Sequence, residues 1–285
     1  MRGFEKYLAL WVALCMGLGL LLSQTVPGVG AAIDSWQVRG VSIPIGICLF
    51  LMMYPAMLNL QLAELRKLRS NPKPILITLL SNWIIAPLVA VGLASLFLKG
   101  NQQLMVAVIL LGASPCTAMV LVWGKLAGGN QEQNVVNTSL NTVTIMFLYV
   151  PLVSLLTGLQ NIPIDRVLLA ISAGIFIGAP LLLGIASKRL LVRAKGREWF
   201  DEIYRPVVGK ISIVALLMTL VVLFALNGEV LLGHFDQLLL VSVPLLLGFG
   251  IVVGFNLLIT RLLGLRYREA IITTIIGSSS HFEIA

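Results

Sequence analysis

Long apolar runs, repeated along the chain, restrict its fold more than any other feature of the sequence. The runs are roughly 18 residues or longer and are separated by short charged loops, and a run of that length can cross a bilayer as a helix. A membrane β-barrel would instead alternate apolar and polar residues in segments of about ten. Soluble domains carry about a quarter charged residues, against 11% here. The sequence therefore predicts an all-α polytopic membrane protein.

We expect nine spans within one transmembrane domain over residues 1–285, and loops too short to hold a soluble domain. The first apolar run lacks a small-x-small cleavage site and further spans follow it, so it is expected to be a retained helix rather than a signal peptide. The spans are predicted at about 8–23, 41–60, 75–98, 103–127, 135–158, 167–187, 210–227, 237–263 and 269 to the end.

The 20 Lys and Arg residues fall unevenly on the two sides of these spans. Seventeen lie in one set of alternate loops, and the other set holds only Arg39, Lys99 and Arg166. Because positive residues favour cytoplasmic loops, the N-terminus is predicted to lie in the cytoplasm. The protein itself is expected in the plasma (inner) membrane. The net charge of +8 is then explained by the placement of basic residues in cytoplasmic loops. Nucleic acid is therefore excluded as a partner. Contact between the basic segment 188–210 and anionic lipid headgroups is a second interpretation of its charge.

Two spans are interrupted in the same way. Span four contains Gly112, Ser114 and Pro115, and span nine contains Gly277 followed by three serines. Proline removes a helical hydrogen bond and clashes with the preceding turn. Backbone groups freed at membrane depth must be satisfied by protein or by a water-filled cavity. Each break alone is compatible with an ordinary kink, but paired breaks in corresponding positions indicate the binding site of a transporter.

The spacing of the breaks predicts an internal repeat. They lie about 165 residues apart, as do the starts of spans one and six, and an odd number of spans per repeat inverts the second copy in the membrane. We expect an inverted five-plus-five helix repeat in which the broken spans four and nine cross. Repeat one would cover about 1–160 and repeat two about 161–285, with the chain truncated within span nine.

Several motifs carry a resemblance to a known family. They are "SIPIGICLFLMMYPAM" (Ser42–Met57), "NWIIAPL" (Asn82–Leu88), "CTAMVLVWGKLAGGN" (Cys116–Asn130), "NTSLNTVTI" in span five and "SSSHFEIA" at the end. Along nearly its whole length the chain resembles the arsenite-efflux permeases of the bile acid/arsenite/riboflavin transporter superfamily. The motifs around Cys116 and Glu283 are the most specific.

The resemblance implies secondary active export of trivalent arsenic, as arsenite or antimonite, from the cytoplasm in exchange for protons. It implies a ten-helix fold with no cofactor, and it assigns the functional cysteine and glutamate of the family to Cys116 and Glu283. Many members have an arginine immediately before the cysteine, where this chain has Pro115. That departure bears on proton coupling and substrate range.

The chemistry of arsenite and of a carboxylate at membrane depth agrees with the assignment of Cys116 and Glu283. Arsenite near neutral pH is mainly an uncharged trihydroxide with a soft centre that prefers thiolate ligands. Cys116 follows the first break, where the amides of a new half-helix would stabilise its thiolate, so it is the expected ligand of trivalent arsenic. Glu283 is the one acid placed deep inside a span, at a cost of roughly 2.5–3.5 kcal/mol when charged. We expect it to bind substrate and to couple protons by cycling between protonated and charged forms.

The remaining candidate substrate-binding residues belong to the breaks or to span five. His281 is either a second proton relay or a polar lining residue. Asn137 and Asn141 lie one turn apart and are expected to hydrogen-bond to the broken helices, whereas Asn82 and Asn256 are interpreted as contacts between helices. The full set is Ser114, Pro115, Cys116, Asn137, Asn141, Ser279, Ser280, His281 and Glu283.

Two other functions need to be compared with this sequence. A sodium-coupled organic-anion symporter of the bile acid type would need oxygen ligands for sodium, which Asn137, Asn141, Ser278 and Glu283 can supply, and no cysteine. A membrane-embedded enzyme is not expected, because His281 and Glu283 do not form the i, i+4 histidine pair of a zinc protease helix. The expected partners are therefore arsenite or antimonite, a proton or sodium as coupling ion, and membrane lipid.

Overall fold

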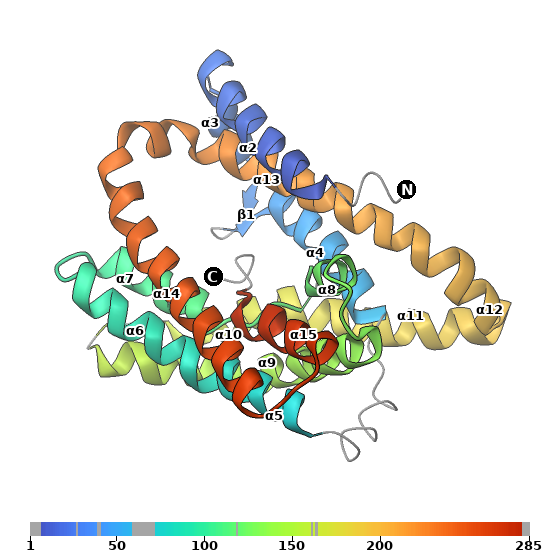
Figure 1. Cartoon of the computed structure of the whole chain (residues 1–285). Helices are drawn as coiled ribbons and strands as arrows, with labels where there is room; N and C mark the ends of the chain where they lie inside the picture. The colour runs from blue at the N-terminus through green and yellow to red at the C-terminus, as the bar shows by residue number, and fades with distance from the viewer. Residues whose placement is uncertain are drawn as a thin grey trace. The chain divides into compact units, whose positions relative to one another are not determined.

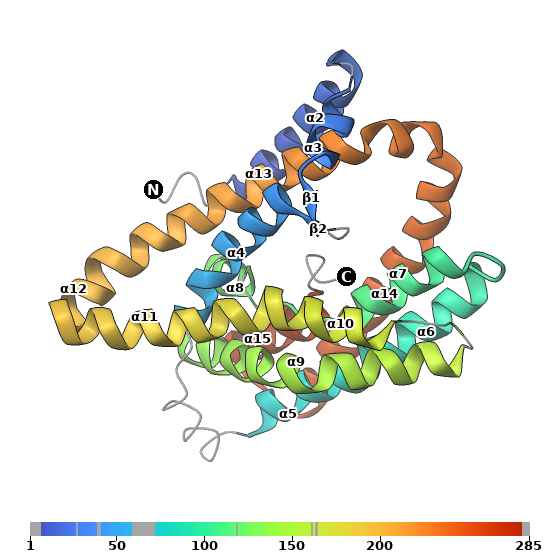
Figure 2. The same ribbon diagram turned by 180° about the vertical axis from the view of Figure 1, so that it is seen from behind.

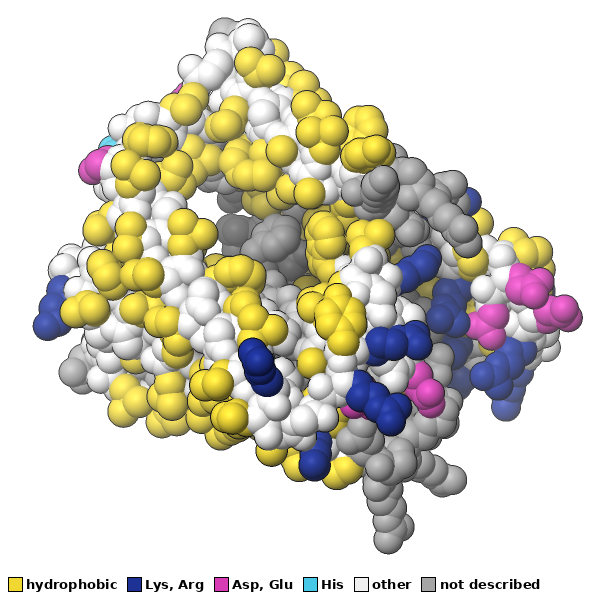
Figure 3. Space-filling model, in the orientation of Figure 1, with side chains coloured by type: hydrophobic (Ala, Val, Ile, Leu, Met, Phe, Trp, Pro, Cys, Tyr) yellow, Lys and Arg dark blue, Asp and Glu magenta, His cyan; other side chains and the backbone are white. Residues whose placement is uncertain are grey.

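The computed structural model describes residues 7–26, 28–38, 41–58, 72–117, 119–160, 162 and 165–280. Within them, six helices are long and apolar enough to cross a membrane, with mean hydropathies between 1.8 and 2.6. Large hydrophobic side chains such as Leu246 and Leu262, each 71% exposed, lie on their outer faces. Figure 3 shows hydrophobic side chains over much of the visible surface. The chain is an all-α polytopic membrane protein, as the sequence predicts.

Each predicted span corresponds to one or more helices. Two carry an asparagine N-cap: the Asn101 side chain accepts a hydrogen bond from the Leu104 amide in α7, and Asn130 accepts from the Glu132 and Gln133 amides in α9. The helices of the nine spans are α2 (Leu8–Thr25), α4 (Ile43–Leu58), α5 (Lys73–Leu80) with η2 (Ser81–Ile85) and α6 (Ala86–Phe97), α7 (Gln102–Gly112) with α8 (Val120–Leu126), α9 (Gln131–Leu159), α10 (Arg166–Ala173) with η3 (Gly174–Gly178) and α11 (Ala179–Lys195), α13 (Arg205–Gly233), α14 (Phe235–Leu262) and α15 (Tyr267–Ser278).

Short elements fill the connections. Helix α3 (Val29–Asp34) is followed by a hairpin of β1 (Gln37–Val38) and β2 (Val41–Ser42), which pair antiparallel. Helix α12 (Arg197–Trp199) and the π-helical segment η4 (Phe200–Tyr204) link α11 to α13.

The chain divides into two compact units. Unit 1 comprises Met1–Leu58 and Ala179–Leu238, and unit 2 comprises Asn59–Gly178 and Leu239–Ala285. Each unit therefore takes segments from both halves of the chain.

In unit 1, α2 and α4 both pack along α13 (Figure 1). The α2–α13 contact is close because glycine occupies the interface: a Cβ on Gly19 would lie 2.6 Å from the Cβ of Phe224. Small residues allow such approach where no hydrophobic effect draws helices together.

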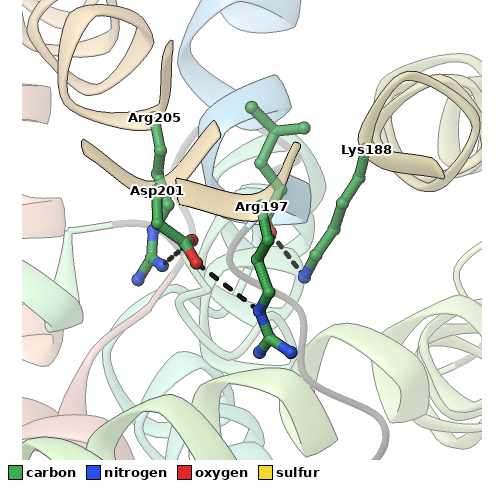
Figure 4. A network of polar contacts seen from close by, with 5 residues as sticks. Lys188, Arg197, Asp201 and Arg205 are labelled. Carbon is green, nitrogen blue, oxygen red and sulfur yellow. Dashed lines mark hydrogen bonds and ion pairs between the residues drawn. The ribbon is translucent and has the colours of Figure 1, made fainter. Parts of the chain in front are cut away.

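Polar contacts gather around the basic turn that leads from α11 through η4 to α13 in unit 1. Asp201 lies between two arginines, 3.0 Å from Arg205 Nη1 and 3.7 Å from Arg197 Nε (Figure 4). The Lys188 ammonium donates to the carbonyl of Leu58 at 3.1 Å. The Lys188 bond joins α11 to the end of α4, while the exposed ion pairs add little energy.

Unit 2 is built around the packing of α6, α7 and α9, whose buried residues include Ala94, Ile109 and Tyr149, each 0% exposed. Helix α10 lies alongside α9 (Figure 2). Helix α15 packs on α5, α8 and α9, so the two interrupted spans and span five belong to the same unit.

Three π-helical segments, η2, η3 and η4, were not predicted. Each ends two residues before a proline that opens the next α-helix, where the missing amide costs little. A wider turn relieves the clash between the proline ring and the preceding turn, which accounts for their position. The prolines are Pro87, Pro180 and Pro206.

Candidate functional site

The first break predicted from the sequence is present. Helix α7 ends at Gly112 and α8 begins at Val120, and the described residues between them are not helical. Pro115 lies in this segment, in keeping with its inability to continue the helix of α7.

The second interrupted span leaves its helix at the predicted place. Helix α15 ends at Ser278, and Ser279 has an extended backbone, with φ −92° and ψ 132°. The two breaks meet: Pro115 and Ser280 form an isolated antiparallel bridge, and the Cys116 amide donates to the Ser279 carbonyl at 3.1 Å. Backbone groups released by one break are thereby satisfied by the other.

A cavity of about 180 Å³ lies beside this junction in unit 2. One wall is apolar and comes from α6, α7 and α14, with Val89, Pro244 and Val252 among its residues. The other wall is polar. It consists of Asn82, Ser114 and the three serines Ser278, Ser279 and Ser280.

The predicted residues Ser114, Pro115, Ser279 and Ser280 all line the cavity. Ser114 is 1% exposed, and its hydroxyl has no hydrogen-bond partner among the described residues. Burying a hydroxyl without a hydrogen-bond partner costs free energy, and a bound ligand or water molecule would remove that cost.

Cys116 is 8% exposed but does not belong to the lining of this cavity. Its side chain packs in an apolar cluster with Val120, Ile272 and Ile276. The interpretation that Cys116 opens the second half-helix is wrong, because α8 begins four residues later, at Val120. Cys116 instead pairs through its backbone with Ser279, and α8 starts only after this paired segment.

The two asparagines of span five pair with span three rather than directly with the broken helices. Asn137 Nδ2 donates to Thr78 Oγ1 at 3.0 Å, and the amide of Asn141 lies against that of Asn82. Both asparagines are at most 1% exposed. Asn82 in turn contacts α15, so Asn141 reaches the second break through one intermediary.

Two contributions to the site were not predicted: Ser81, which donates to the Gly277 carbonyl at the end of α15, and the α14 wall, where Pro244 and Gly248 line the cavity. The interpretation of Asn82 and Asn256 as contacts between helices is confirmed, because Asn82 lies against Asn141 and the end of α15 and Asn256 bonds Ser81. The available signal was a buried asparagine on a largely apolar helix, which is costly without a partner.

His281 and Glu283, the most polar pair of the predicted site, lie outside the described residues. The described chain stops at Ser280, which lines the cavity. Their roles stay predictions.

Comparison with known proteins agrees with this architecture. The Sodium Bile acid symporter family matches residues 46–234. An uncharacterized transporter of Synechocystis sp. (strain PCC 6803) is 39% identical over 305 residues, covering 99% of this chain and 79% of that protein.

Two further relatives bear the name Arsenical-resistance protein Acr3. That of Alkaliphilus metalliredigens is 33% identical, covering 99% of this chain and 82% of the relative, and that of Corynebacterium glutamicum is 28% identical, covering 99% and 78%. The resemblance to arsenite-efflux permeases is confirmed by these matches. The family matches about two thirds of the chain, and the chain has helices long enough to cross a bilayer. This chain therefore belongs to the Sodium Bile acid symporter family of membrane transporters.

Proposed function

We propose that this protein is a secondary active transporter that exports trivalent arsenic from the cytoplasm across the plasma membrane. The cargo is arsenite, with antimonite as a chemically similar second cargo, and the exchanged ion is the proton. The observation that carries the proposal is the meeting of two helix breaks beside a small cavity lined by serines. The Acr3 relatives at 33% and 28% identity support the choice of cargo.

The size of the cavity supports a small cargo. Its volume of about 180 Å³ lies below the roughly 300 Å³ at which pockets for drug-sized ligands begin. Its described polar groups are hydroxyls and one amide, which can hydrogen-bond the hydroxyls of an uncharged trihydroxide.

Cys116 supplies the soft ligand in this proposal. Its thiol condenses with arsenite to give a sulfur–arsenic bond and one water molecule, and the reverse reaction releases the cargo. Because the Cys116 amide is bonded to Ser279, the thiol belongs to the same junction as the serine wall. Loading requires the thiol to turn from the apolar cluster of Val120, Ile272 and Ile276 toward the cavity.

Glu283 is the proposed proton-coupling residue. With the site facing inward, arsenite and a deprotonated Glu283 share the site, and protonation on the outside favours release. A ligand shifts such an equilibrium only through its difference in affinity between the two states. The crossing of spans four and nine near the midplane of an inverted repeat belongs to the same proposal. It is supported by the two units, each of which takes spans from both halves.

The test is arsenite accumulation in cells that lack their own arsenite exporter, at two external pH values and with or without sodium. Wild-type protein is expected to lower accumulation, and more strongly at acidic external pH. Cys116→Ser keeps the size and polarity of the side chain but loses the soft ligand, so accumulation should return to the level of cells without the protein.

Cys48→Ser is the matched control, since Cys48 lies in α4 of unit 1 and is not in the described site. Both variants are compared at equal amounts of membrane protein. Full export by Cys116→Ser would contradict the thiol mechanism.

The second candidate function is a sodium-coupled organic-anion symporter, which the family description favours. It predicts transport that depends on sodium, not on external pH, and that is unaffected by Cys116→Ser. The same assay with a labelled organic anion separates the two functions.

A further inference from the structure

The end of α15 is a helix C-terminus inside a membrane-spanning unit, so its last carbonyl groups need donors from elsewhere. Two of them are satisfied locally, because the Ser278 hydroxyl donates to the Thr274 carbonyl and the Ser279 hydroxyl to that of Ile275. The next carbonyl groups, those of Ile276 and Gly277, receive their hydrogen bonds from span three.

Ser81 is the donor to Gly277. Its hydroxyl oxygen lies 2.7 Å from the Gly277 carbonyl oxygen and 2.7 Å from Asn256 Nδ2 of α14. A serine hydroxyl has one proton. Because the Asn256 amide must donate, the Ser81 hydroxyl accepts there and its single proton points to Gly277.

Asn256 is itself held in place. Its Nδ2 also donates to the Val252 carbonyl of its own helix at 2.8 Å, and its side chain is 0% exposed. Both protons of the amide are therefore used, one on α14 and one on Ser81. The rotamer of Asn256 thus fixes the direction of the Ser81 hydroxyl.

Asn82 completes the set. In the orientation that satisfies its neighbours, its amide nitrogen donates to the carbonyl groups of Ile276 at 3.1 Å and Gly277 at 3.3 Å, while its oxygen accepts from Asn141 Nδ2 at 2.8 Å. Ser81 and Asn82 both belong to the π-helical segment η2, and such segments are frequent at functional sites.

Gly277 gives an independent indication of how closely these side chains approach. A Cβ at this position would lie 2.8 Å from Asn256 Oδ1 and 3.1 Å from the Ser81 Cβ. Any larger residue would force Asn256 or Ser81 to move. The glycine that interrupts span nine is therefore also the residue that lets the two donors reach the backbone.

We propose that Ser81 and Asn256 are positioning residues for transport, acting as a relay that fixes the end of α15 and thereby the cavity wall formed by Ser278, Ser279 and Ser280. The inference rests on the proposed function, in which that wall binds the cargo. Neither side chain needs to touch the cargo, because both act through the Gly277 carbonyl.

The experiment compares Ser81→Ala and Asn256→Leu with matched controls in the intact transporter. Ser95→Ala and Thr260→Val are the controls, because among the described residues these hydroxyls bond only backbone carbonyl groups of their own helices. Ser95 bonds that of Val91 at 2.7 Å, and Thr260 bonds those of Asn256 at 2.6 Å and Leu257 at 3.1 Å. The first readout is amide hydrogen exchange of residues 272–280 in the purified protein without cargo. The second is the arsenite concentration for half-maximal transport in vesicles.

Both relay variants are expected to speed exchange at the end of α15 and to raise the half-saturating arsenite concentration by about tenfold, the change for one lost buried hydrogen bond. The double variant should be no worse than either single one, since each breaks the same relay. Gly277→Ala should act in the same direction. The controls should stay within about twofold of wild type.

A merely structural role would lower the amount of folded transporter and its maximal rate without changing half-saturation, and that result would overturn the proposal. Unchanged exchange at the end of α15, or additive effects in the double variant, would overturn it as well. If exchange rises as expected but the wild type transports no arsenite, the relay stands and the assignment of cargo fails.

Discussion

Ser114 is a buried cavity residue whose hydroxyl has no partner among the described residues. Replacing it with alanine removes no described hydrogen bond within the protein, so we expect Ser114→Ala to leave thermal stability unchanged or slightly higher. If the hydroxyl binds the cargo, half-saturation should rise by about tenfold, as for one lost hydrogen bond. Thermal unfolding in detergent and uptake kinetics in vesicles measure the two effects.

Ser212 is the matched control in unit 1. Its hydroxyl donates to the Met52 carbonyl at 3.0 Å and joins α13 to α4. Ser212→Ala should destabilise the protein by about 1 kcal/mol and leave half-saturation unchanged. A loss of stability in Ser114→Ala equal to that in Ser212→Ala would show that the Ser114 hydroxyl has a structural partner instead.

The sequence predicted the location of the residues at the two helix breaks, while their role in binding stays a prediction. Ser114, Pro115, Ser279 and Ser280 line the cavity, as expected for breaks at membrane depth whose freed backbone groups must be satisfied by protein or by a water-filled cavity. The orientation of Cys116 could not be predicted, because it depends on the α8 start and on packing against α15. Asn256 was interpreted correctly as a contact between helices, but its partner could not be predicted, because Ser81 is 175 positions away in the chain.

At the scale of helices, hydropathy and turn residues predicted most spans to within a few residues, but span six, expected to end near 187, continues to Lys195, and span seven, expected at about 210–227, is α13 over Arg205–Gly233. Span five, expected at about 135–158, is α9 over Gln131–Leu159. The extra residues come from the Asn130 cap, which starts the helix before its apolar part. The π-helical segments were missed because an apolar run with a proline looks the same whether the preceding turn is α or π.

Gly112 ends α7 in close contact with α6. A Cβ there would overlap the Cβ of Ala90, so Gly112→Ala should force the helices apart and cost about 1–3 kcal/mol of stability. Gly92→Ala in α6 is the matched control. A Cβ at Gly92 meets nothing within 4 Å among the described residues, so alanine should stabilise that helix by roughly 0.5–1 kcal/mol.

Thermal unfolding of the two purified variants, side by side, measures the difference. The expected order of midpoints is Gly92→Ala, wild type, Gly112→Ala. Equal midpoints for the two variants would mean that α6 and α7 do not pack as closely as their residues indicate.

At the scale of the whole molecule, charge distribution predicts orientation but not the division into units. Unit 1 unites Met1–Leu58 with Ala179–Leu238, a pairing that depends on which helix faces are complementary. Glycines such as Gly19 at the α2–α13 contact become meaningful only once the partner helix is known. Loop charges act independently of packing, so the orientation can be tested without reference to either unit.

We predict that the turn between α11 and α13 faces the cytoplasm and that the loop between α6 and α7 faces outward. The basic segment 188–210, which comprises this turn and the adjoining ends of α11 and α13, contains seven of the 20 Lys and Arg residues, whereas the loop between α6 and α7 contains only Lys99, and positive loops stay inside. Single cysteines are introduced as Lys99→Cys and Arg193→Cys in a background with Cys15→Ser and Cys48→Ser. Cys116 is retained as it is buried, and the background protein without an added cysteine reports any labelling at that position.

In intact cells an impermeant thiol reagent should label Lys99→Cys but reach Arg193→Cys only after permeabilisation. The reverse pattern would mean that the orientation is inverted. Labelling of both positions in intact cells would contradict the alternation of loops on which the span assignment depends.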